Sequence, residues 1–237
     1  MRQKFRKGIL IFSLLMFPIT FMLLSPFVIV VSAANGVLNG SAMIFGLLLL
    51  FSMVGSRLFC GWLCPGGALQ EYVAVVNDRH WNSKGKNISK YITWTVWVSF
   101  IVYLWLQNDN LKGDFMYFIE FNFQYFIIYA IVMVLIYMFT LVTGRRGMCH
   151  SLCWMAPFMV IGEKLADFLH IPRFRLMAKA DDCISCGQCN KNCPMCLDVL
   201  TMVEAGAMDS SECINCLECV DGCPKKAIAF GICQKHR

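Results

Sequence analysis

Two cysteine-rich runs near the end of this 237-residue chain restrict its fold more than any other feature of the sequence. Residues 183–194 read CISCGQCNKNCP, and residues 213–224 read CINCLECVDGCP. Each run has the pattern C-x2-C-x2-C-x3-C-P. Three thiolates at this spacing on one tight loop bind three irons of a cubane, and the fourth iron takes a cysteine from elsewhere. The pattern therefore predicts two [4Fe–4S] clusters.

The division of the eight cysteines follows from the exchange of the fourth ligand between motifs in two-cluster ferredoxins. One cluster is expected to use Cys183, Cys186, Cys189 and Cys223. The other is expected to use Cys213, Cys216, Cys219 and Cys193. Residues 178–237 would then form a bacterial-ferredoxin-like α+β domain. Because so short a segment has little apolar core of its own, the clusters would nucleate its folding.

Other uses of these cysteines fit the pattern less well. Structural zinc sites commonly use two C-x2-C pairs, whereas both runs here have three cysteines followed by Cys-Pro. Disulfides are disfavoured on the cytoplasmic side of a membrane. Cys196 and Cys233 lie outside both predicted ligand sets, and their roles stay open.

The rest of the chain is marked by long stretches without charge. No Asp, Glu, Lys, Arg or His occurs from Gly8 to Ser56, and uncharged runs recur at Tyr91–Asn108 and Phe121–Gly144. Because a bilayer core requires about 20 apolar residues per helix, we expect an α-helical membrane protein. The four expected transmembrane helices cover about 9–32, 42–57, 89–107 and 123–143. A cleavable signal peptide is the alternative for the N-terminus, but its apolar region would be shorter.

Basic residues gather on one side of these predicted spans. They are Arg2, Lys4, Arg6 and Lys7, then Arg57, Arg79, Lys84, Lys86 and Lys90, and finally Arg145 and Arg146. Since Lys and Arg are enriched in cytoplasmic loops, both termini and the ferredoxin domain are expected in the cytoplasm, with the chain in the cell (inner) membrane. The net charge of +6 is interpreted as this topology signal, so no nucleic-acid partner is predicted.

An internal repeat lies in the predicted membrane domain, residues 1–177. Residues 55–64 read GSRLFCGWLC and residues 144–153 read GRRGMCHSLC, with the same Gly, Arg, Leu and two Cys positions. Each copy precedes an amphipathic stretch, Ala68–Val76 or Pro157–Leu169, expected as a cytoplasmic interfacial helix. We therefore expect two pseudo-symmetric helical hairpins.

The repeat suggests a third site at Cys60, Cys64, Cys149 and Cys153. Residues four apart share a helix face, so two such pairs could supply four thiolates to iron–sulfur or zinc. Pro65 biases Cys64 away from helical geometry, so that pair is also compatible with a helix end. Plain buried thiols and a redox-active dithiol are the alternatives. No haem is expected, because the histidines (His80, His150, His170 and His236) lie outside the apolar runs.

Taken together, the four apolar segments, the Cys-x3-Cys pairs and the two ferredoxin runs resemble the NapH/NosR-type membrane polyferredoxins. The resemblance implies an electron-transfer subunit that links a quinone pool or a ferredoxin to partner redox proteins. We therefore expect a membrane-bound iron–sulfur protein that passes electrons between cytoplasmic donors, two [4Fe–4S] clusters and a quinone or partner protein. It would be part of an oxidoreductase system rather than a stand-alone enzyme, and no catalytic residue is assigned. An assembly factor for a partner metalloenzyme and a redox sensor are the alternatives.

Overall fold

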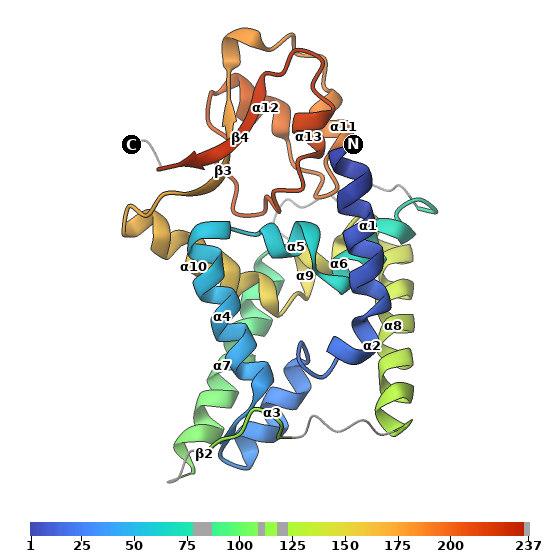
Figure 1. Ribbon diagram of the computed structural model, residues 1–237, viewed down its shortest axis with the longest axis vertical. Coiled ribbons are helices and arrows are strands. Elements are labelled where there is room, and N and C mark those ends of the chain that lie inside the picture. Colours follow the sequence, from blue (N-terminus) through green and yellow to red (C-terminus); the bar gives the residue numbers. More distant parts are fainter. Residues whose placement is uncertain (78–86, 109–111, 118–122, 235–237) are drawn as a thin grey trace.

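The computed structural model describes residues 1–77, 87–108, 112–117 and 123–234, with only the backbone for 123–125. An elongated helical body carries a smaller unit of short helices and two strands at one end (Figure 1). Arg79, Lys84, Lys86, His80 and His236 lie outside the described residues.

Ten helices and one small sheet make up the described part of the body. The helices are α1 (Arg2–Leu15), α2 (Phe17–Thr20), α3 (Pro26–Ala34), α4 (Gly40–Gly55), α5 (Leu58–Trp62), α6 (Pro65–Val73), α7 (Ile88–Leu106), α8 (Phe123–Thr143), α9 (Gly147–Ser151) and α10 (Met155–Phe168). Strands β1 (Val37–Leu38) and β2 (Lys112–Gly113) pair in parallel. The predicted amphipathic stretches lie largely in α6 and α10.

The C-terminal unit is built around an antiparallel pair of strands. Its elements are β3 (Arg173–Ala178), η1 (Ala180–Asp182), α11 (Gln188–Asn192), α12 (Val199–Glu204), α13 (Glu218–Asp221) and β4 (Ile228–Cys233). Its apolar core continues into the body, because Cys60, Cys149 and Met159 belong to the same buried cluster as Ile214 and Leu217. The unit therefore rests on the body through a shared core.

The prediction of four membrane-spanning helices is wrong for the described residues. The predicted span 9–32 is divided among α1, α2 and α3, because Pro18 lies in the first turn of α2 and Pro26 begins α3. Proline lacks the N–H that would continue a helix, so these residues start helices and do not merely kink one. The second predicted span, 42–57, is α4 with 16 residues, which is short for a bilayer core.

The last two predicted spans differ from each other. Helix α7 has 19 residues, but it contains Lys90 and several Trp, Tyr, Thr and Ser residues. Its mean hydropathy is therefore too low for a membrane span. Within α8, Phe126–Thr143 has a mean hydropathy of 2.5 and is the one stretch in the described residues that is long and apolar enough to cross a membrane.

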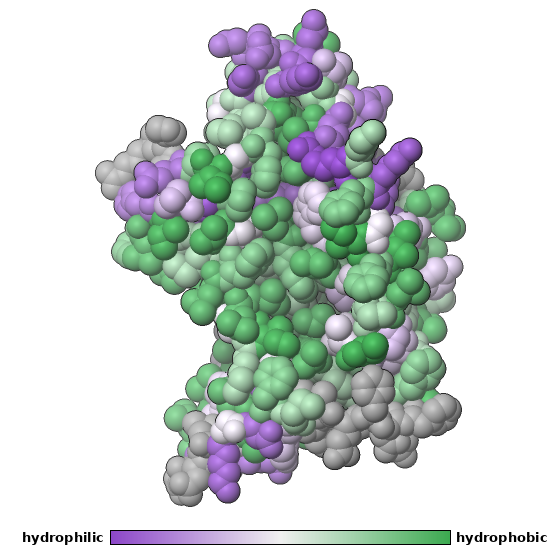
Figure 2. Space-filling view, in the orientation of Figure 1, coloured by the Kyte–Doolittle hydropathy of each residue, from purple (hydrophilic) through white to green (hydrophobic). Residues whose placement is uncertain are grey.

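The predicted pseudo-symmetric hairpins are also wrong. Helix α4 packs mainly against α10, α3 packs against α7, and α6 contacts both α1 and α8. The long helices thus pair with elements from the other half of the body, because a hydropathy pattern does not specify which apolar faces meet. The outer faces of α1, α4, α7 and α8 remain apolar and exposed, and Figure 2 shows this apolar surface between hydrophilic ends.

Candidate functional site

The two ferredoxin-type runs fold into backbone loops of the same shape. Ser185 and Asn215, 30 positions apart, have φ of 50° and 49°, while Gly187 and Leu217 have φ of 69° and 66°. A left-handed backbone at a residue such as Leu is strained by about 1–3 kcal/mol and persists only where the surroundings enforce it. The repetition of this strain indicates that both loops are shaped to surround an object of the same form.

Eight cysteines line two small cavities in the C-terminal unit. One cavity is lined by Cys183, Cys186, Cys189 and Cys223, and the other by Cys193, Cys213, Cys216 and Cys219. The structure thus brings together the sets that the sequence predicts, each with one cysteine from the other run. Cys186 is exposed, whereas Cys193, Cys216 and Cys219 are buried. A backbone N–H also donates a hydrogen bond to one of the sulfurs, from Ala227 N to Cys223 Sγ at 3.3 Å.

These donor sets fit a cluster better than a single ion. Four soft thiol donors surround each cavity, the ligand set that [4Fe–4S] clusters require. In the described part of the chain, no three His, Cys, Asp or Glu side chains lie close enough to hold one metal ion. A cubane holds its cysteine sulfurs farther apart than a single ion does, because each sulfur binds a different iron. Burial raises the pKa of the Cys216 thiol to about 12, as expected for a protonated thiol in the metal-free protein.

The second of these loops docks directly on the helical body at Gly61 in α5. A Cβ at Gly61 would lie 2.3 Å from the carbonyl oxygen of Ile214, so only glycine permits this approach. Trp62 Nε1 donates to the Asn215 carbonyl at 3.0 Å, and Gln3 Nε2 donates to the Cys216 carbonyl at 3.1 Å. The Cys60–Cys64 segment is therefore in backbone contact with the second cluster-binding loop.

Buried ion pairs hold this docking in place. Arg57 and Lys90, both about 1% exposed, bind the carboxylate of Glu212 at 3.1 and 2.5 Å, directly before Cys213. Burial alone would raise the pKa of Glu212, but the two cations outweigh it and hold the pKa below its ordinary value. On the other side, Arg6 binds Glu218 at 2.8 Å, directly before Cys219.

The carboxylate of Glu71 in α6 joins Arg6 to Arg146, at 2.5 and 2.6 Å. Both arginine side chains are at most 1% exposed. Burial would raise the pKa of Glu71, yet Arg146 and Arg6 lower it to about 2. The arginines and Lys90 are predicted from the sequence only as a membrane-topology signal, and their carboxylate partners Glu71 and Glu212 are not predicted. The available signal was that Arg57 and Lys90 fall within the predicted spans 42–57 and 89–107, where a buried cation needs a carboxylate partner.

The repeated Cys-x3-Cys segments also meet in the fold. Cys60 lies in α5 and Cys149 in α9, whereas Cys64 and Cys153 follow the ends of those helices. The hypothesis that each pair shares one helix face is therefore wrong, and both pairs straddle a helix end. At Cys64 the cause is Pro65, since the backbone there is extended with ψ of 116°.

The four thiols lie close enough for each to interact electrostatically with the other three. Cys60 Sγ is 3.4 Å from Met159 Sδ, and Gln70 Nε2 donates to Cys149 Sγ at 3.3 Å. The structure thus gathers two cysteine pairs that are 89 residues apart in the sequence.

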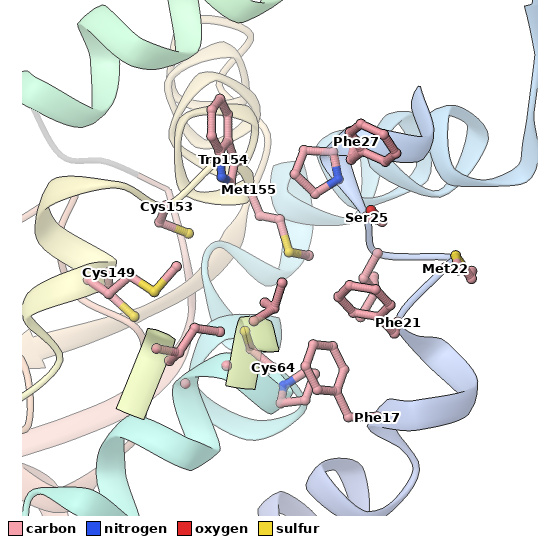
Figure 3. Close-up of a pocket in the computed structure, with 18 of the residues that line it drawn as sticks. Phe17, Phe21, Met22, Ser25, Phe27, Cys64, Cys149, Cys153, Trp154 and Met155 are labelled. Carbon is pink, nitrogen blue, oxygen red and sulfur yellow. The ribbon is translucent and has the colours of Figure 1, made fainter. Parts of the chain in front are cut away.

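A cavity of about 450 Å³ adjoins this cysteine group. Figure 3 shows Cys149 and Cys153 at one side, Cys64 below them, and Phe17, Phe21 and Phe27 across the cavity. Ile128, Val132 and Ile136 of α8 complete an almost entirely apolar lining. Such a cavity suits a lipophilic small molecule.

Comparisons with known proteins agree with an iron–sulfur assignment. Residues 40–84 match a family described as a 4Fe-4S binding domain, and residues 175–224 match a family described as a 4Fe-4S dicluster domain. The Escherichia coli (strain K12) protein named "Putative electron transport protein YccM" is 21% identical over 180 residues, which cover 68% of this chain and 48% of that protein. This chain thus spans about half the length of that relative.

An uncharacterized protein of Methanocaldococcus jannaschii is 23% identical over 196 residues, which cover 79% of this chain and 70% of that protein. No solved structure matches this chain at a significant level. The chain thus contains two 4Fe–4S-binding domains and is distantly similar to a protein named for electron transport. These findings support iron–sulfur electron transfer.

Proposed function

We propose that this chain is a membrane-attached electron carrier that exchanges electrons between a soluble redox protein and a quinone. The observation that carries the proposal is the pair of four-cysteine cavities, one of which packs against the helical body. Clusters bound there would supply one-electron carriers, with potentials set by hydrogen bonds, charge and solvent exposure. The relationship to NapH/NosR-type membrane polyferredoxins is likewise part of this proposal.

The chain's residues give the two cavities different surroundings. Cys186 is exposed, so a soluble donor or acceptor can approach the first cavity closely. The second cavity faces the body, where Trp62 and Gln3 hold its loop by hydrogen bonds. This asymmetry supports a path from the exposed side of the C-terminal unit into the body.

The apolar cavity supports a quinone as the lipophilic partner. Its volume lies in the range of small-molecule sites, and Phe17, Phe21 and Trp154 offer aromatic faces to a flat ring. The amide of Gln70 and the hydroxyl of Ser25 are among the polar groups along its wall. A quinone takes up two electrons and two protons to become a quinol, so electrons would be exchanged one at a time across this wall.

Membrane attachment is proposed through α8 and the exposed apolar surface. Only 11% of the stretch Phe126–Thr143 is buried within the protein, and Arg145 follows its end after one glycine. A positive residue next to a span favours the cytoplasmic side, which would place the C-terminal unit in the cytoplasm. The N-terminus would lie on the same side, because Arg2 binds Asp221 of that unit at 2.5 Å.

The test uses the full chain, purified anaerobically in detergent and reduced with dithionite. Reoxidation by a menaquinone analogue is followed by visible absorbance in a stopped-flow instrument. Val132→Trp would fill the cavity, whereas Val134→Trp on the exposed face of the same helix is the matched control. We expect reoxidation to slow about tenfold or more in Val132→Trp, equivalent to 1.4 kcal/mol, and to stay unchanged in Val134→Trp.

Equal rates in both variants would remove the cavity as the quinone site. Wild-type protein that is reduced but not reoxidised by quinone would contradict the proposed partner. If such protein also forms a stable complex with a metalloenzyme, the result would favour the assembly-factor alternative. Loss of partner binding on cluster removal would favour the redox sensor.

A further inference from the structure

The match at residues 40–84 poses a ligand problem that the fold resolves. That segment is similar to a 4Fe-4S binding domain but contains only two cysteines, Cys60 and Cys64, whereas a [4Fe–4S] cluster takes four. We propose that Cys60, Cys64, Cys149 and Cys153 bind a third [4Fe–4S] cluster and that Arg57 and Arg146 balance its charge. The inference deepens the proposed electron-transfer function and rests on it.

The two cysteine pairs present their sulfurs in equivalent ways. The first cysteine of each pair lies in a five-residue helix, α5 or α9, and is buried. The second lies where a new helix begins, so that a backbone N–H three residues on faces its sulfur: Gly67 for Cys64 and Ala156 for Cys153. Amides directed at thiolates in this manner stabilise their negative charge. Each pair thus combines a buried cysteine in a short helix with a second cysteine just ahead of the next helix.

The two arginines occupy matching positions beside this group. Arg57 and Arg146 are the residues directly before α5 and α9, and both are 1% exposed. Arg57 interacts electrostatically with Cys60, Cys149 and Cys153, while Arg146 interacts with Cys149. The Nε atoms of both arginines are buried and have no hydrogen-bond partner among the residues that the structure describes. An unpartnered buried guanidinium N–H is unfavourable and calls for an acceptor that the protein itself does not provide.

Charge counting supports an anionic occupant. Among the described residues, four buried cations (Arg6, Arg57, Lys90 and Arg146) share three carboxylates in this network. A cubane with four thiolate ligands carries net negative charge in both of its ordinary redox states. Binding such a group would offset the remaining positive charge, which is otherwise buried without compensation.

The place of this group in the fold also fits an intermediate site. On one side, Gly61 lies between Cys60 and Cys64 and packs against Ile214 of the second ferredoxin loop. On the other side, Cys64, Cys149 and Cys153 line the apolar cavity, as Figure 3 shows. A cluster here would lie between the C-terminal unit and the proposed quinone, and would pass single electrons between them.

A single zinc ion fits this group less well. Within the described ranges, no cluster of three metal-binding side chains is tight enough for one ion. The same is true of the eight cysteines of the two ferredoxin runs, which lie within the segment that matches the dicluster family. Neither the four body cysteines nor the cysteines of the two ferredoxin runs are therefore gathered as a single-ion site in the described ranges.

The experiment measures iron and acid-labile sulfide per chain in anaerobically purified full-length protein, together with EPR of the reduced form. About 12 irons per chain are expected, whereas about 8 would correspond to the two ferredoxin clusters alone. Cys60→Ser and Cys149→Ser are expected to lower the content to about 8 and to remove one EPR species while retaining the other two. Cys233→Ser is the matched control and is expected to keep all the iron.

The wild-type count decides the matter even if the serine variants do not fold. About 8 irons in wild-type protein, with or without one zinc, would overturn the third cluster and leave the proposed two-cluster carrier standing. An unchanged iron content in both folded variants would also overturn it. Protein without any iron would instead contradict the proposed function itself, so the two failures are distinguishable.

Discussion

The ion pairs of the Glu71 carboxylate allow a quantitative prediction about stability. It binds two arginines that are at most 1% exposed, while its own side chain is 15% exposed. Burial would raise its pKa, but Arg146 and Arg6 lower it from 4.5 to about 2. At 1.36 kcal/mol for each pKa unit, the interaction contributes about 3 kcal/mol of stability at neutral pH. In other proteins, removal of one partner of a buried ion pair lowers the free energy of unfolding by about 3–5 kcal/mol, a range that includes this value.

The sign of the pH dependence follows from the lowered pKa. The contribution is complete above the unfolded pKa of 4.5 and is lost as the pH falls through about 2. Because iron–sulfur clusters are themselves labile in acid, a substitution at neutral pH is the cleaner perturbation. We expect Glu71→Gln to lower the free energy of unfolding by about 3 kcal/mol, and hence Tm by about 6–12 °C.

The measurement is an anaerobic thermal melt of the full chain in detergent, followed by tryptophan fluorescence. Asp221→Asn is the matched control, because Asp221 also binds an arginine at 2.5 Å but both side chains are about one third exposed. Exposed pairs contribute about 1 kcal/mol or less, so this variant should melt within a few degrees of wild type. Equal shifts in the two variants would refute the argument from burial.

Three further predictions concern the docking and the clusters. Gly61→Ala places a methyl group against the carbonyl of Ile214 and should lower the free energy of unfolding by about 1–3 kcal/mol. Gly66→Ala is the control, because a methyl group there meets open space. Equal melting temperatures for the two variants would contradict the close approach at Gly61. Cys186→Ser should remove the EPR signal of one ferredoxin-type cluster, and Cys233→Ser should leave both signals intact. Chelation of iron should make the C-terminal unit sensitive to protease before the helical body is cleaved. Mass spectrometry of the fragments measures the order of cleavage. Simultaneous cleavage of the unit and the body would show that the clusters do not stabilise the unit.

Local chemistry explains why much of the C-terminal site could be predicted from sequence. The spacing of cysteines in a short loop limits which thiols can surround one cavity, and the structure groups Cys183 and Cys213 with the expected partners. Pro65 likewise made a helix end between Cys60 and Cys64 one of the two readings open from sequence, and the structure has that helix end. The number of membrane spans was not, because the averaged hydropathy of residues 9–32 does not show that Pro18 and Pro26 start new helices.

The sequence by itself determined the kinds of ligand and their local spacing, since these depend on neighbouring residues and backbone sterics. Only the tertiary structure decided which distant groups meet: Cys60 with Cys149, Glu71 with two arginines, and Gly61 with the loop at Ile214. The physical reason is that a buried charge or thiol specifies the chemistry of its partner but not the position of that partner in the chain. The packing of α4 on α10 and of α6 on α1 and α8 supplies that information.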